Sequence, residues 1–211
     1  MSEHSLTTVV RMPRANPMTP DERRLALIEA TRPLLLEHGT SITTRQIAEC
    51  ADVAEGTIFR AFGTKQALIE AVVDDCLSPD ALIQALYRVP VELDLEDTVT
   101  WVIKTMQART RQVRSLMMAL YPNSDRPGPM AHKRPHHQFH GLVNNALGHL
   151  LTRFDDQLRV GTPTACWAIT AMSFASTMPF SDDPDTTDPR QVARLILHGI
   201  INDPIREEAS C

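Results

Sequence analysis

Residues 43–65, TTRQIAECADVAEGTIFRAFGTK, contain two short amphipathic segments joined by a tight turn. Thr43, with a Gln three residues later, has the form of a capping box, so a helix is expected from Thr44. Asp52 then interrupts the apolar period, and Asp tolerates turn geometry. A second helix is expected from Glu55. This arrangement is typical of a helix-turn-helix, whose second helix usually enters the major groove of DNA.

The second predicted helix divides into an apolar and an outer face. The apolar face is expected to bury Ile58, Phe59 and Phe62. The outer face is expected to carry small or polar residues, namely Gly56, Thr57, Arg60 and Ala61. An outer face of this kind suits close approach to DNA.

The pattern T-x-x-x-I-A-x-x-A-x-V-A-x-G-T-I-F-x-x-F-x-T-K-x-A-L resembles the N-terminal DNA-binding domain of TetR-type transcriptional regulators. The resemblance runs from about Leu25 to Val73, and beyond it only general helical architecture is similar. It implies a homodimeric, ligand-responsive repressor that binds a palindromic operator. A small effector in the C-terminal domain would release the operator.

Candidate DNA contacts follow from the resemblance and from side-chain chemistry. Hydroxyl and N–H groups at a helix start suit phosphate, Arg suits a guanine edge or phosphate, and Lys suits phosphate. The candidates are Thr43, Thr44, Arg45, Thr57, Arg60 and Lys65. Two positions depart from the family pattern: Ala54 stands where Ser commonly caps the recognition helix, and Ala61 where Tyr or His commonly contacts the backbone.

The residues that precede the helix-turn-helix predict a disordered arm followed by one helix. Residues 1–18 lack periodicity and predict a disordered arm, which is either a floppy terminus or a carrier of Arg11 and Arg14 into a minor groove. Thr19 with Pro20 predicts a helix start, and Gly39 its end. Pro33 lies inside this helix and predicts a kink or bend.

The remainder reads as helices separated by proline-rich loops, so the fold class is all-α. Helices are expected over about 65–77, 79–89, 95–121, 137–154, 162–178 and 189–200. The predicted domains are an arm (1–18), a three-helix helix-turn-helix DNA-binding domain (19–76), a helical effector-binding and dimerisation bundle (77–205) and a tail (206–211).

The last two long helices are the expected dimer interface. Residues 165–178 are rich in Ala, Ser and Thr, and the final helix has a broad apolar stripe. Paired with a second copy they would build a four-helix bundle, as in the family; the alternative is an ordinary monomer core. A mostly apolar effector is expected among Trp101, Met106, Met117, Met118, Phe139 and Met172.

The net charge, the spacing of the cysteines and the lack of a secretory signal limit the classes of function that the chain can have. The net charge is −5, and the first 70 residues hold 8 Lys or Arg against 9 Asp or Glu, so DNA affinity needs a local basic face and two copies. The cysteines, Cys50, Cys76, Cys166 and Cys211, show no C-x-x-C spacing and are expected to be reduced thiols. Residues 1–20 lack a secretory signal, and no apolar run is long enough to cross a membrane, so a cytoplasmic protein without a membrane partner is expected.

A histidine cluster supports the main alternative. His132, His136, His137 and His140 lie close in sequence, and an i, i+4 pair on a helix suits a metal. The stretch has no Cys or acidic residue, so a solvated loop or pocket rim is favoured, and no metal site or cofactor is predicted. Without a Ser/His/Asp or phosphate-cradling signature, no catalytic residue is predicted and an enzyme is disfavoured. The alternative is a helical small-molecule-binding or metal-sensing module, or an enzyme, with a relic DNA-binding head.

Overall fold

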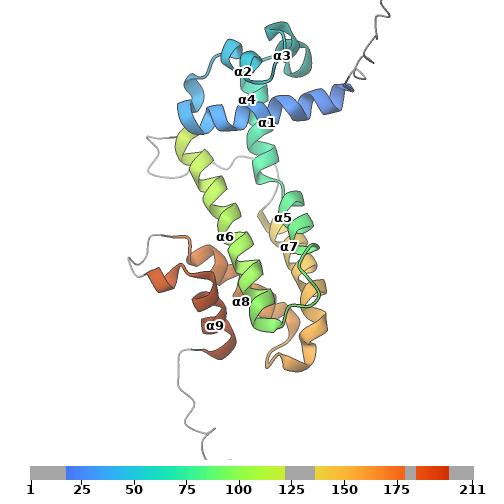
Figure 1. Cartoon of the computed structure of the whole chain (residues 1–211), viewed down its shortest axis with the longest axis vertical. Coiled ribbons are helices and arrows are strands. Elements are labelled where there is room, and N and C mark those ends of the chain that lie inside the picture. The colour runs from blue at the N-terminus through green and yellow to red at the C-terminus, as the bar shows by residue number, and fades with distance from the viewer. Residues whose placement is uncertain (1–17, 122–135, 179–183, 200–211) are drawn as a thin grey trace, which may run out of the picture.

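The computed structural model describes residues 18–121, 136–178 and 184–199, with the side chains of the helix that starts at residue 136 described from His140 onward. Within these ranges the regular structure is helical and contains no strand. A small group of helices forms a head at one end, and the other helices form an elongated body below it (Figure 1). The all-α prediction is confirmed.

The head contains four α-helices whose starts agree with the predicted caps. They are α1 (Pro20–His38), α2 (Thr44–Cys50), α3 (Glu55–Phe62) and α4 (Lys65–Leu77). Thr19 and Thr43 each form a complete capping box. Thr64 accepts a hydrogen bond of 3.0 Å from the backbone N–H of Ala67. These side-chain bonds satisfy N–H groups that have no partner inside the helix.

The proline in α1 is accommodated at the surface. The helix continues from Pro20 to His38 across Pro33, whose side chain is exposed. Proline lacks the N–H that would bond the carbonyl of Glu29, and Glu29 is also exposed, so water can reach this part of the helix. The interior proline therefore does not end the helix.

The end of α1 touches the long helix of the body. Gly39 has a φ of 57°, and a Cβ placed there would lie 2.6 Å from the backbone oxygen of Ala119. Only glycine allows both this backbone conformation and this approach. A short 3-10 turn, Gly39–Ser41, then leads to α2.

The core of the head includes one end of that long helix. Leu27, Ile47, Ile58 and Leu68, one from each head helix, are fully buried. Leu116, Met117 and Leu120 pack into the same cluster although they belong to α6 (Leu95–Leu120). The head is therefore closed by a helix that begins in the body.

The body is formed by the remaining helices around a second core. They are α5 (Asp80–Leu86), the larger part of α6, α7 (His136–Leu151), α8 (Thr162–Ala175) and α9 (Pro189–His198). The core consists of apolar side chains from all five, among them Leu86, Val102, Ile103, Val143, Leu147, Ile169 and Val192. No helix in the described ranges has the length and apolarity that a bilayer crossing requires.

Buried and ionic contacts hold α9 against α6. The amide nitrogen Nε2 of Gln107, which is fully buried on α6, donates to Ser176 Oγ at 2.9 Å and to the Thr187 carbonyl at 3.0 Å. Two arginines of α9 bond to the start of α6: Arg190 donates to Asp97 at 2.6 Å, and Arg194 donates to Glu96 at 3.0 Å. Gln107 thus joins α6 to the end of α8 and to the residue before the cap of α9, and the two arginines hold α9 beside the start of α6.

Several predicted positions need correction. Phe59 is 49% exposed, whereas Ala61 packs against the head core. On a helix Ala61 and Phe62 lie three and four residues after Ile58 and share its face, but Phe59 is rotated by about 100° from Ile58. Helix α7 ends at Leu151, earlier than predicted, because its last turn tightens into a 3-10 helix, Thr152–Gln157.

Candidate nucleic-acid interface

The turn between α2 and α3 has the geometry expected of a helix-turn-helix. Asp52 adopts a positive φ of 51°, and the backbone N–H of Val53 returns to the carbonyl of Ala48 at 3.0 Å. Val53 also packs partly into the head core. Because both the backbone and this side chain are held, the orientation of α3 relative to α2 is fixed.

The predicted DNA contacts lie at the starts of α2 and α4 and along α3. Thr43, Arg45 and Arg60 are exposed, while Thr44 and Thr57 are half-buried. The Thr44 hydroxyl donates to the carboxylate of Glu55, at the start of α3. This bond holds the start of α2 beside the start of α3.

Arg45 is already engaged by a neighbouring carboxylate. Its Nε donates to Glu49 Oε1 at 2.9 Å, and the Arg45 side chain is 81% exposed. The hydrogen bond and the charge of Glu49 raise the pKa of Arg45 above its usual value. Water and salt screen an ion pair this exposed, so the guanidinium can exchange Glu49 for a phosphate or a base at small cost.

Lys65 has a structural role that the sequence pattern did not reveal. Its Nζ donates to the carbonyls of Thr40 and Ile42, at 3.1 and 2.8 Å. The lysine thereby ties the start of α4 to the segment that precedes α2. An ammonium group has three donors, so one remains for a phosphate.

A second arginine, on α1, contacts the C-terminal end of α3, the second helix of the motif. Arg24 on α1 donates to the carbonyl of Ala61 and lies over the ring of Phe62, 4.2 Å from its centroid. The positive charge lies near the C-terminal end of α3, where the helix dipole favours a cation. No sequence motif marked Arg24, because its partners come from another helix.

The interface also contains acidic side chains. Glu49, Asp52 and Glu55 are exposed on α2, on the turn and on α3. They offset Arg45 and Arg60, so this part of the head is not strongly basic. Sequence-independent attraction to phosphates is consequently weak, and contacts to particular bases carry more of any specificity.

Two arginines connect the interface to the body at the end of α4. Arg32 on α1 forms an ion pair with Asp75, and Arg109 on α6 donates to the Ser78 carbonyl at 2.7 Å. Between them Cys76 is buried, and burial raises the pKa of its thiol. The C-terminal turn of α4 is therefore held by side chains from both the head and the body.

The predicted effector residues do not form one group. Met106 is buried in the body core and Trp101 packs against it, whereas Met117 lies in the head core and Met118 is exposed. The side chain of Phe139 lies outside the described residues. The set taken from the sequence is thus divided between two cores.

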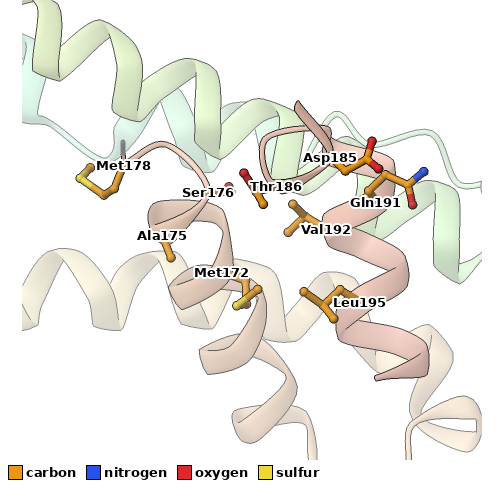
Figure 2. A pocket seen from close by; sticks show the side chains of 9 residues that line it. All are labelled: Met172, Ala175, Ser176, Met178, Asp185, Thr186, Gln191, Val192 and Leu195. Carbon is orange, nitrogen blue, oxygen red and sulfur yellow. The ribbon is translucent and has the colours of Figure 1, made fainter. Parts of the chain in front are cut away.

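A cavity of about 210 Å³ lies between α8, α9 and the 3-10 turn Pro184–Thr186 (Figure 2). Among the predicted effector residues it contains only Met172, which faces Leu195 and Val192 across the space. Ser176, Asp185, Thr186 and Gln191 add polar groups. A second hollow, of about 390 Å³, lies between α7 and α8, and its lining includes Asn144, Asn145 and His149.

The histidine cluster falls mostly outside the described side chains. His132 lies outside the described residues, His136 and His137 begin α7, and His140 is exposed. In the described ranges no three His, Cys, Asp or Glu side chains are grouped to hold a metal. Cys50 is exposed, and Cys76 and Cys166 are buried as free thiols.

The head is similar in sequence to known bacterial regulators. Residues 27–72 match the model of the family described as bacterial regulatory proteins, tetR family. An HTH-type transcriptional regulator of Bacillus subtilis, YvkB, is 44% identical over 57 residues, which are 26% of this chain and 29% of that protein. The chain thus matches less than a third of that relative's length.

Two solved structures share the fold over most of the chain. The TetR family transcriptional regulator PfmR from Thermus thermophilus is 17% identical, with a TM-score of 0.50 over 83% of this chain and 99% of that one. The fatty acid degradation regulator FadR from Bacillus halodurans is 16% identical, with a TM-score of 0.50 over 86% and 97%. Residues 27–72, which include the helix-turn-helix, therefore match the tetR family of bacterial regulatory proteins, and the rest of the chain shares the fold of the two solved structures.

Proposed function

We propose that this chain is a homodimeric repressor that binds a palindromic operator and releases it when a small effector binds the body. The observation that carries the proposal is the helix-turn-helix at residues 43–65, in which Arg45 on α2 and Arg60 on α3 are exposed to solvent. Residues from its two helices can reach a phosphate strand and the major groove together. Such a function acts on chromosomal DNA, which corresponds to a cytoplasmic location and requires no catalytic residue.

A dimer is proposed through α8 and α9. Trp167 and Phe174 on α8 are 67% and 57% exposed, and Leu195 on α9 is also exposed. Large apolar side chains gathered on neighbouring helices commonly mark an interface. A single helix-turn-helix contacts only one half-site, so two copies related by a twofold axis suit a palindrome.

The proposed effector site is the cavity between α8 and α9, where apolar side chains face a few polar groups (Figure 2). Helix α6 contacts α8 and α9 at one end and α1 at the other. An effector that binds better when α6 is displaced would therefore shift the head as well. A coupling free energy of about 1–3 kcal/mol is typical of such control.

A binding module with a relic head is supported by one observation. Two candidate DNA contacts, Thr44 and Arg45, are bonded to Glu55 and Glu49. If these bonds are permanent, neither side chain can reach DNA. The two functions predict different DNA-binding behaviour.

The test is binding of the full chain to the intergenic DNA upstream of its own gene, over a series of salt concentrations. A repressor should bind this DNA more tightly than a scrambled duplex, with an affinity that falls as salt rises. Equal and weak binding to both duplexes would reject the repressor and favour the module with a relic head.

A further inference from the structure

The bond between Thr44 and Glu55 joins the two helices of the motif through a carboxylate. Glu55 is the first residue of α3, and its oxygen Oε1 accepts from the Thr44 hydroxyl. Among the described residues, no hydrogen bond reaches its other oxygen, Oε2, and the side chain is exposed. One carboxylate oxygen is thus held in place while the other remains available.

In a complex with DNA, the Glu55 carboxylate weakens binding unless it accepts a hydrogen bond from the DNA. In helix-turn-helix proteins the N-terminal residues of the second helix approach base edges. A negative charge there is repelled by the DNA phosphates. Because Arg45 is paired with Glu49, Glu55 is not required as its hydrogen-bond partner.

Only one DNA base offers the Glu55 carboxylate a hydrogen-bond donor without an acceptor beside it on the same base. An ionised carboxylate only accepts hydrogen bonds. In the major groove guanine shows two acceptors, thymine an acceptor and a methyl group, and adenine an acceptor beside its donor. Cytosine alone presents its N4 amino group without an acceptor beside it on the same base.

We propose that Glu55, positioned by Thr44, selects cytosine at one position of each operator half-site. This inference rests on the proposed DNA-binding function and adds a specificity-determining residue to it. Thr44 acts as a positioning residue: its hydroxyl is occupied by Glu55, while its backbone N–H, at the first position of α2, has no acceptor within the helix and can bond a phosphate.

The experiment begins by selecting binding sites from a randomised DNA duplex library with the wild-type full chain and with Glu55→Gln. Glutamine pairs with adenine through N6 and N7. The variant should therefore exchange cytosine for adenine at one position per half-site. Duplexes that differ only there should show a reversal of preference of about tenfold.

Two further variants separate base reading from charge and folding. Asp52→Asn removes an equal charge from the turn between the two helices, tolerates the same backbone conformation, and should raise affinity for all duplexes without changing the selected base. Thr44→Val should retain cytosine but with a preference reduced several-fold, because the carboxylate is no longer held. Circular dichroism melting confirms that each variant is folded.

The outcomes distinguish the inference from the function on which it depends. If the wild-type chain selects a consensus and Glu55→Gln selects the same one at every position, Glu55 does not read a base and the inference is wrong. If the wild-type chain selects no consensus, the proposed DNA-binding function itself fails.

Discussion

The head and the body are built from helices of the same kind, but their positions are determined by different interactions. In the head, Thr19, Thr43 and Thr64 mark the helix starts with bonds to residues three positions away. In the body, Gln107 and Arg190 bond to partners more than 65 residues away. Local caps therefore mark the helix starts of the head, whereas bonds between distant residues hold α9 of the body against α6.

Helix α6 belongs to both regions. Apolar side chains between Leu95 and Met106 pack in the body core, and Leu116, Met117 and Leu120 pack in the head core. The family resemblance ended at about residue 73 and gave no indication of this. The comparison predicts that changes at the shared end of α6 affect both regions, whereas changes within the head remain local.

The largest expected effect is that of Leu116→Ala. Leu116 is 1% exposed in the head core, and replacing a buried leucine with alanine costs about 2–5 kcal/mol. Both tryptophans, Trp101 and Trp167, lie in the body, so urea unfolding followed by fluorescence reports on the body and circular dichroism on the whole chain. Both transitions should shift to lower urea. The exposed neighbour Met118→Ala should change neither by more than about 0.5 kcal/mol.

Gly39→Ala should have the next largest effect. The substitution combines an unfavourable backbone conformation with a Cβ that lies 2.6 Å from the Ala119 oxygen, for a cost of about 2–4 kcal/mol. Gly63→Ala is the matched control, since Gly63 also has a positive φ but no atom within 4 Å of the added Cβ. Equal losses for the two variants in urea unfolding would show that the contact with α6 is unimportant.

Arg109→Met should weaken the junction moderately. It removes the donor to the Ser78 carbonyl at the end of α4, and leaving such a group unpaired costs about 1–3 kcal/mol. Hydrogen exchange should show faster opening of the last turn of α4. Arg111→Met, at an exposed position on the same helix, should leave that turn unchanged. Unaltered exchange in Arg109→Met would contradict the proposed connection.

The smallest expected effect is a gain within the head. Ala54 occupies the cap position of α3 and makes no side-chain bond to it, so Ala54→Ser should stabilise the chain by about 1 kcal/mol. Thr43→Ala, which removes an existing cap from α2, should destabilise it by a similar amount. Thermal unfolding measures both, and a loss of stability in Ala54→Ser would show that the cap geometry is wrong.

The sequence predicted helix starts and the turn because Thr caps, prolines and Asp52 act over three or four residues. It misplaced Phe59 because a count of apolar residues does not fix which side of a short helix faces the core. The sequence analysis also grouped Met117 with Met106. The two residues are eleven positions apart on α6, so Met106 packs in the body core and Met117 in the head core. Arg24 and the second role of Lys65 depend on distant carbonyls, which no local pattern encodes.

The central claim is that two such heads bind DNA together. It is tested most directly by a hydroxyl-radical footprint of the full chain on the intergenic DNA upstream of its own gene. The account predicts two protected patches on one side of the duplex, centred about 10 base pairs or a whole number of turns apart, and weaker protection with Arg45→Ala. A single patch, or no protection at concentrations that saturate the scrambled duplex, would contradict it.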